Sequence, residues 1–180
     1  DALWLGFDSD AAISLAALDD AAGGIVKSAV TTRMRDTTLV RIHLNRPILV
    51  SAAVDGHAWN ITLGTEVVEP SRQITLSRSM AEVQRSSIVI SMDNPRKMHR
   101  IEDVDIGDTL LVVTGLAPTR GFPKSQEFVE FRVLPSTHGV VLQPVADDLI
   151  TELSADKIIV TRPTGLTLSQ VRDGEHGKNR

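Results

Sequence analysis

Cysteine and tyrosine are absent from this sequence of 180 residues, and the aromatic side chains are limited to two Trp and four Phe. The lack of cysteine excludes disulfides, thiolate zinc sites and cysteine nucleophiles together. Aromatic rings form the usual platforms for sugars, so their scarcity argues against a sugar-binding surface. Both Trp4 and Trp59 fall within expected strands, at positions that we expect to be buried.

Basic charge and long apolar runs are also scarce. The 19 Lys and Arg against 23 Asp and Glu give a net charge of −4. Because phosphate binding needs a net basic face, this balance argues against a nucleic-acid partner. No run approaches the roughly 18 apolar residues of a transmembrane helix, so none is expected. The sequence also lacks a Gly-x-Ser-x-Gly elbow, a Walker-type loop and a Gly-x-Gly-x-x-Gly motif, so a nucleotide enzyme is not expected.

What dominates the sequence is a series of short apolar or alternating runs separated by turn residues, a pattern typical of β-strands. Two runs, residues 48–54 and 59–63, flank Asp55-Gly56, which is a strong hairpin signal, and we expect them to pair. Further strands are expected at residues 3–7, 38–44, 74–76, 87–92, 109–114, 128–134, 140–145, 157–161 and 166–168. The pattern therefore predicts an all-β, or β-dominated, fold.

Helical signals are few. Residues 10–22 are rich in Ala, follow a capping Ser9 or Asp10 and precede a Gly pair, so we expect one short helix near the N-terminus. Residues 79–82 have the form of a capping box and allow a single turn.

The order of the expected strands and turns occurs twice, at an offset of roughly 90 residues, as a duplicated β-module would leave it. We therefore expect two similar sandwich-like modules. The first, residues 1–80, holds the short helix, and the second covers residues 81–169. Residues 170–180 are polar and are expected to form a mobile tail.

Histidines and acids give no recognisable site. The five His show no metal-ligand spacing, so we expect no metal, no cofactor and no catalytic histidine: His43, His57, His99, His138 and His176. The acidic residues at 102, 103, 105 and 108 lack the EF-hand pattern and are interpreted as a turn at Gly107, with the cations of residues 96–100 as surface partners. The paired acids at 19–20 and 147–148 favour turns or helix surfaces over a glycosidase site.

The most distinctive loop covers residues 116–126, with two Pro, one Gly, two cations and a single aromatic residue. An exposed Phe122 between Arg120 and Lys124 would form an interaction loop. The alternative is that Phe122 tucks over the edge of a sheet as a plug.

Three segments carry a family resemblance. They read Phe-Val-Glu-Phe-Arg-Val-Leu-Pro at 128–135, His-Gly-Val-Val-Leu-Gln-Pro-Val-Ala-Asp-Asp at 138–148, and Lys-Ile-Ile-Val-Thr-Arg-Pro-Thr-Gly-Leu-Thr-Leu-Ser at 157–169. These segments resemble the β-rich region that precedes the tetratricopeptide repeats in large exported proteins of alphaproteobacteria. Leu-Trp-Leu-Gly-Phe-Asp at 3–8 and the Ala-rich sequence after it resemble an upstream strand–helix unit of the same proteins. The strand organisation is also similar to β-sandwich targeting modules of cell-wall amidases.

The resemblance implies a scaffold role in the periplasm or cell envelope, and the lack of cysteine is also compatible with the cytoplasm. The apolar start after Asp1 is interpreted as a cut, so the chain is expected to be part of a larger protein. We therefore expect a non-enzymatic interaction or scaffold domain that binds an envelope protein or peptidoglycan. Its mechanism would be edge-strand addition or a loop contact. Two alternatives are a carbohydrate-binding or hydrolase accessory module, with an exposed Trp beside paired acids, and a structural spacer.

Overall fold

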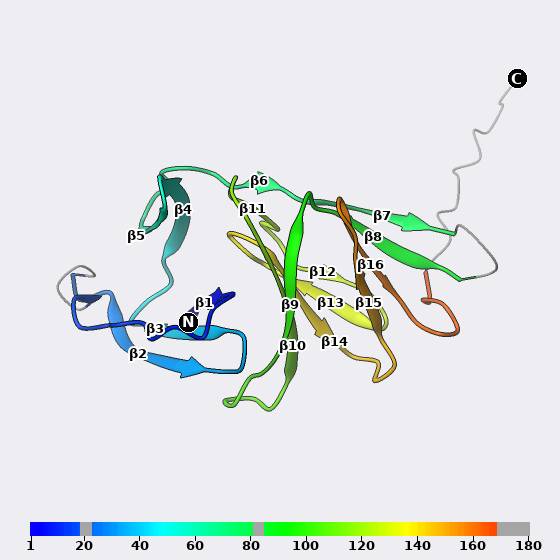
Figure 1. Ribbon diagram of the computed structural model, residues 1–180, viewed down its shortest axis with the longest axis horizontal. Coiled ribbons are helices and arrows are strands. Elements are labelled where there is room, and N and C mark those ends of the chain that lie inside the picture. Colours follow the sequence, from blue (N-terminus) through cyan, green and yellow to red (C-terminus); the bar gives the residue numbers. More distant parts are fainter. Residues whose placement is uncertain (19–22, 81–84, 169–180) are drawn as a thin grey trace, which may run out of the picture.

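Regular structure is confined to β-strands in residues 1–18, 23–80 and 85–168, the part of the chain that the computed structural model describes (Figure 1). The expected all-β fold is confirmed. No helix of the described residues is long and apolar enough to cross a membrane.

Two sheets face each other and form a β-sandwich on one side of the molecule (Figure 1). The first has the order β12-β13-β14-β10-β9, with β9 (Pro95–Glu102), β10 (Thr109–Gly115), β12 (Gln126–Glu127), β13 (Phe131–Leu134) and β14 (Val140–Pro144). The second has the order β15-β16-β8-β7, with β7 (Thr75–Ser79), β8 (Ser87–Ser91), β15 (Ile150–Leu153) and β16 (Lys157–Thr161). A short parallel pair, β6 (Arg72–Gln73) and β11 (Arg120–Gly121), lies beside them.

The core of the sandwich follows from alternation along its strands. Every second side chain of a strand points to one face, and in β8 and β16 these side chains are apolar and fully buried. Ile90 lies opposite Ile158, and Ile88 lies opposite Val160. The facing sheet supplies the other half of the core: Leu111, Val113, Phe131, Val133, Val140 and Leu142. Burial of these side chains is the main source of stability for such a fold.

A three-stranded sheet covers part of the outer face of the β9–β10 pair. It has the order β1-β3-β2, with β1 (Ala2–Phe7), β2 (Val26–Arg33) and β3 (Thr38–Leu44). Gly6 of β1 lies against Val112 of β10, and the Arg41 side chain donates a hydrogen bond of 3.1 Å to the carbonyl of Glu102. The same guanidinium lies 4.7 Å from the ring centroid of Trp4, in a cation–π contact. The five residues from 38 to 42 are therefore buried although they lie outside the sandwich core.

A separate hairpin of β4 (Leu49–Asp55) and β5 (Ala58–Gly64) stands between this sheet and the sandwich in sequence, and it pairs as the sequence predicts (Figure 1). Asp55 lies opposite Ala58 across the two-residue turn of Gly56 and His57. Gly56 has a positive φ of 61° and His57 does not, which identifies a type II′ turn with its glycine at the first central position. This turn fixes the register of the hairpin.

Residues 10–17 of the expected helix are not helical, Leu18 is the one helical residue of its described part, and residues 19–22 lie outside the described residues. Its first carbonyl groups are occupied by other partners. The Thr38 hydroxyl donates to the carbonyls of Ser9 and Ala11 at 2.7 and 3.0 Å, and the Arg33 side chain donates to that of Asp10 at 2.6 Å. Tertiary hydrogen bonds have therefore replaced the intrahelical ones. The turn expected at 79–82 and the tail expected at 170–180 also involve residues outside the described part.

Strand pairing does not follow the expected duplication. In the first half β1 pairs with β3 and β4 pairs with β5, whereas the strands at the matching positions of the second half lie in different sheets. The boundary expected between residues 80 and 81 falls between β7 and β8, which are paired neighbours in one sheet. The described residues hold one sandwich, and the first half adds a sheet and a hairpin to it. Residues 166–168, expected to form a strand, are not in one.

Truncating the centre of the sandwich tests its role in stability. Phe131→Ala removes a ring that is 0% exposed and is expected to lower the free energy of unfolding by about 3–5 kcal/mol in urea denaturation. Val129→Ala, at a side chain that is 64% exposed, is the control and is expected to change it by less than about 0.5 kcal/mol. Equal losses for the two variants would contradict this description of the core.

Candidate functional site

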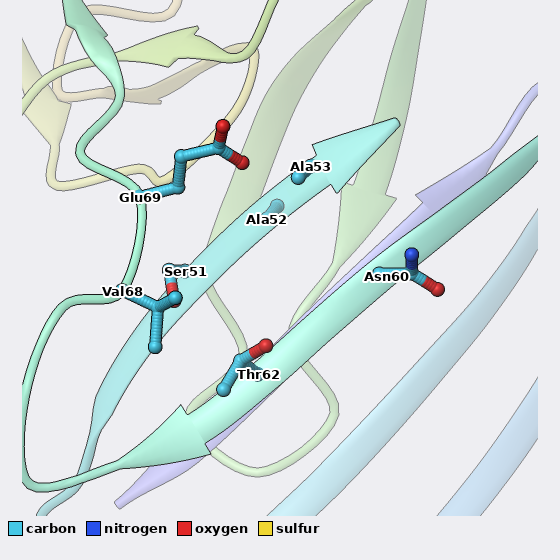
Figure 2. A pocket seen from close by; sticks show the side chains of 7 residues that line it. All are labelled: Ser51, Ala52, Ala53, Asn60, Thr62, Val68 and Glu69. Atoms are coloured by element: carbon cyan, nitrogen blue, oxygen red, sulfur yellow. The ribbon is translucent and has the colours of Figure 1, made fainter. Parts of the chain in front are cut away.

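A small hollow that contains one buried hydroxyl without a partner lies on one face of the β4–β5 hairpin (Figure 2). Ser51 of β4 lies opposite Thr62 of β5, and Ala53 lies opposite Asn60. Because the β4 residues are small, they leave a hollow of about 60 Å³ on this face. Its lining consists of Ser51, Ala52, Ala53, Asn60, Thr62, Val68 and Glu69.

Figure 2 shows how these side chains are arranged. Val68 and Glu69 come from the segment after β5, which folds back along the β4 side of the hairpin, while Asn60 and Thr62 form the β5 side. Ser51 is only 3% exposed, and its hydroxyl has no hydrogen-bond partner. A buried hydroxyl without a partner costs about 1–3 kcal/mol, so this position is a candidate for ligand contact.

The opposite face of the hairpin is apolar and packs against the sandwich at one point. Trp59 packs against His138 with the ring centroids 4.6 Å apart and the planes tilted by 42°. The hairpin is also held by Thr119, which precedes β11 and whose hydroxyl donates a 2.8 Å hydrogen bond to the carbonyl of Ala52 in β4. Trp59 is nevertheless 37% exposed, so the expectation that it is buried is wrong. Trp4 is half-buried.

His138 joins three segments of the chain. Its Nδ1 accepts a hydrogen bond of 3.2 Å from the backbone N–H of Arg120, so its Nε2, 2.8 Å from the carbonyl of Gly115, is the protonated nitrogen of a neutral ring. Burial lowers the pKa of His138 below its usual 6.5, the Arg120 charge lowers it further, and the Gly115 hydrogen bond opposes this shift. The imidazole is therefore held neutral as a structural link between the hairpin and the sandwich.

The structure separates the three residues of the expected interaction loop. Phe122 is only 1% exposed and belongs to the sandwich core, so its ring does not lie on the surface. Arg120 is half-buried, and its guanidinium donates to the carbonyl of Asp93. Lys124 alone is exposed. Gly121 explains this packing, because a Cβ at this position would lie 2.1 Å from the carbonyl oxygen of Ser136.

His99 has a structural partner, the carboxylate of Asp8. His99 is not paired with the neighbouring acids on the surface. Its Nε2 lies 2.6 Å from Asp8, whose carboxylate also accepts from the Thr114 hydroxyl at 2.7 and 2.8 Å. Because the threonine hydroxyl bonds the carboxylate and not the imidazole, this group lacks the nucleophile–base contact of a catalytic triad. It ties the end of β1 to the β9–β10 pair.

The paired acids at 147–148 face in different directions. Asp148 accepts two hydrogen bonds from Arg162, at 2.7 and 3.1 Å, which hold the pKa of its carboxyl below the usual value and raise the pKa of Arg162. Asp147 lines a hollow of about 280 Å³ at the end of the sandwich, together with Arg100 and Asp108. None of the residues that line this hollow is aromatic, so the expected pairing of an exposed Trp with acids is not found there.

Metal ligands are not gathered anywhere in the described residues: no group of three or more His, Cys, Asp or Glu could hold an ion there. Of the five histidines, His43 lies in β3, His57 lies in the β4–β5 turn, and His176 lies outside the described residues. No known protein family, no curated protein and no solved structure matches the chain.

The free edge of β5 is the second candidate site. In a two-residue hairpin the pair beside the turn is hydrogen-bonded, so alternate pairs are not. The backbone N–H and C=O groups of Trp59, Ile61 and Leu63 therefore point away from β4. The contact of Thr119 with the outward carbonyl of Ala52, which lies opposite Ile61, agrees with this register. Residues 58–62 are all exposed, and in the described part of the chain β5 pairs with β4 alone.

The neutral state of His138 predicts a pH dependence of stability. Because the folded-state pKa lies below 6.5, the unfolded chain binds the proton first as the pH falls. The contribution of His138 is therefore complete above pH 6.5 and is lost as the pH falls from there through the folded-state pKa. We expect the free energy of unfolding to fall between pH 7.5 and pH 5 by more in the wild type than in His138→Gln, measured by urea denaturation. The same pH-dependent difference in both proteins would contradict this role.

Proposed function

We propose that this chain is a non-enzymatic interaction module that binds an extended segment of a protein partner along the free edge of β5. The observation that supports this most directly is the composition of that edge. Its seven residues, Ala-Trp-Asn-Ile-Thr-Leu-Gly, contain no charge and no proline, and their pairing with β4 has no bulge. An exposed edge without such protection is a template for pairing with another chain.

Two other long edges of the described sheets, β2 and β9, are protected. β2 carries Lys27 and Arg33 and has an irregular register near its start. β9 begins with Pro95, carries four basic residues and has a register shift opposite β10. The edge of β1 is also uncharged, but one face of this strand lies against β10 at Gly6 and its central side chains are half-buried. Of the two uncharged edge strands, β5 is the more exposed, and this supports β5 as the site of strand addition.

An added strand would complete the hairpin. An isolated pair of strands is marginally stable, and a third strand with an apolar face improves it. The side chains of Trp59 and Ile61 lie on the apolar face, next to the positions that the partner's own apolar side chains would take. The partner is therefore an extended segment in which apolar and polar residues alternate.

The envelope setting is part of the proposal and is supported by the resemblance of the strand segments to exported alphaproteobacterial proteins. A protein partner is favoured over peptidoglycan because the free groups of β5 are those of a peptide backbone. The carbohydrate alternative is less favoured, since the exposed Trp59 rests on His138 and not beside paired acids. A spacer role is less favoured because Val54, Trp59 and Ile61 are all at least 37% exposed on one hairpin.

Two substitutions at one residue test the role of the backbone. Ile61→Pro removes the outward N–H group while leaving the hydrogen bonds between β4 and β5 in place, since proline is tolerated where a strand's N–H faces solvent. Ile61→Ala keeps that group and removes only the side chain. Immobilised chains would be used to recover proteins from an alphaproteobacterial envelope extract. We expect a defined partner with the wild type and Ile61→Ala, and at least a tenfold loss with Ile61→Pro.

Circular dichroism and urea denaturation would confirm that both variants are folded. Recovery of the same partner by Ile61→Pro, or of no partner by the wild type, would count against strand addition at β5.

A further inference from the structure

We infer that the partner segment carries a basic side chain, Lys or Arg, which enters the hollow formed by Ser51, Asn60, Thr62 and Glu69 (Figure 2). This inference rests on the proposed strand addition at β5 and adds the chemistry that selects the partner.

The hollow lies on the path of a side chain from an added strand. Asn60 and Thr62 belong to β5 and point to the face that holds the hollow, while Ile61 between them points to the other face. A partner residue directly opposite either one therefore projects its side chain over the same face. In Figure 2 the segment with Val68 and Glu69 flanks β4, on the side away from β5.

Distance restricts that side chain to a long one. Neighbouring strands lie about 4.8 Å apart, so an added strand would lie roughly 10 Å from β4. A short side chain would end over β5. Lys and Arg can lay their apolar stems across the neighbouring strand while placing the charged head beyond it.

The groups that line the hollow favour a cation. Glu69 is the only charged residue among them, and no Lys, Arg or His lines the hollow. Ser51, Asn60 and Thr62 offer oxygen atoms that accept hydrogen bonds. The Ser51 hydroxyl, buried and without a partner, would gain one from an ammonium or guanidinium donor that enters the hollow across β5. A volume of about 60 Å³ suits the head of one side chain and a few water molecules.

A peptide selection tests this specificity on the full 180-residue chain. Random nine-residue peptides displayed on phage would be selected on immobilised wild-type protein. We expect the enriched peptides to alternate apolar and polar residues and to carry Lys or Arg on the polar face. One such peptide and its Gln-substituted version would then be synthesised, and their affinities measured by fluorescence anisotropy.

Matched variants assign the preference to the hollow. We expect the basic peptide to bind the wild type about two- to fivefold more tightly than its Gln version, the range of an exposed ion pair. Glu69→Gln is expected to abolish that difference. Glu66→Gln makes the same charge change at an exposed residue outside the hollow and is expected to preserve it.

The outcomes separate the two proposals. If the basic and Gln peptides bind equally, or the preference survives in Glu69→Gln, the inference is overturned. Strand addition still stands in that case, provided that Ile61→Pro weakens both peptides. If no enriched peptide depends on the Ile61 N–H group, strand addition fails and this inference fails with it.

Discussion

Contact between the inner faces of the two sheets is the interaction on which the rest of this structure depends. The apolar side chains of β8 and β16 meet those of β10, β13 and β14. The three-stranded sheet has its docking surface only because the β9–β10 pair is held in this sandwich. The β4–β5 hairpin is supported in the same way, through Thr119 and His138 at the end of the sandwich. The two smaller units therefore depend on the sandwich core for their stability.

Polar contacts determine where these outer units sit. Asp8 receives hydrogen bonds from two sides, Arg41 reaches the backbone of Glu102, and His138 connects three segments. Hydrogen bonds are directional, whereas apolar burial is not. The core therefore supplies most of the free energy, while a small number of buried polar groups select one arrangement of the outer units.

Much of the strand content could be predicted because it depends on local alternation. The expected strands at residues 38–44 and 157–161 match β3 and β16 to the residue. The pair Asp55-Gly56 was enough to predict the hairpin turn. β2 and β9 were missed because edge strands carry the basic residues and the proline that protect them, and these obscure the apolar period. The helix at residues 10–22 was expected from composition, which cannot register the distant Thr38 and Arg33 that take its carbonyls. Phe122 does lie in a loop, but the burial of its side chain depends on distant residues that composition cannot register either.

The hollow was not predictable, because its residues come from two strands and a returning segment. Alternation places Ser51 and Asn60 on faces of their own strands, but only the hairpin register makes them neighbours. Glu69 is brought to them by a segment with no periodic pattern. The free edge of β5 could be predicted in part, because the expected hairpin leaves the outer edges of both its strands open. What the sequence did not reveal is that Thr119 contacts the β4 edge and leaves that of β5 uncovered.

The parallel pair β6–β11 has a mechanical consequence for any load applied to the hairpin. Within four residues after the hairpin and its return segment, the Ser71 hydroxyl bonds the carbonyl of Thr137, and the backbone N–H groups of Arg72 and Ile74 bond the carbonyls of Thr119 and Gly121. Tension on β5 reaches these three bonds before it reaches β7. They lie on a segment whose next side chain, Ile74, is buried in the core. These three hydrogen bonds therefore anchor the chain between the hairpin and β7, so a pull transmitted along the chain loads them before it loads the strands of the core.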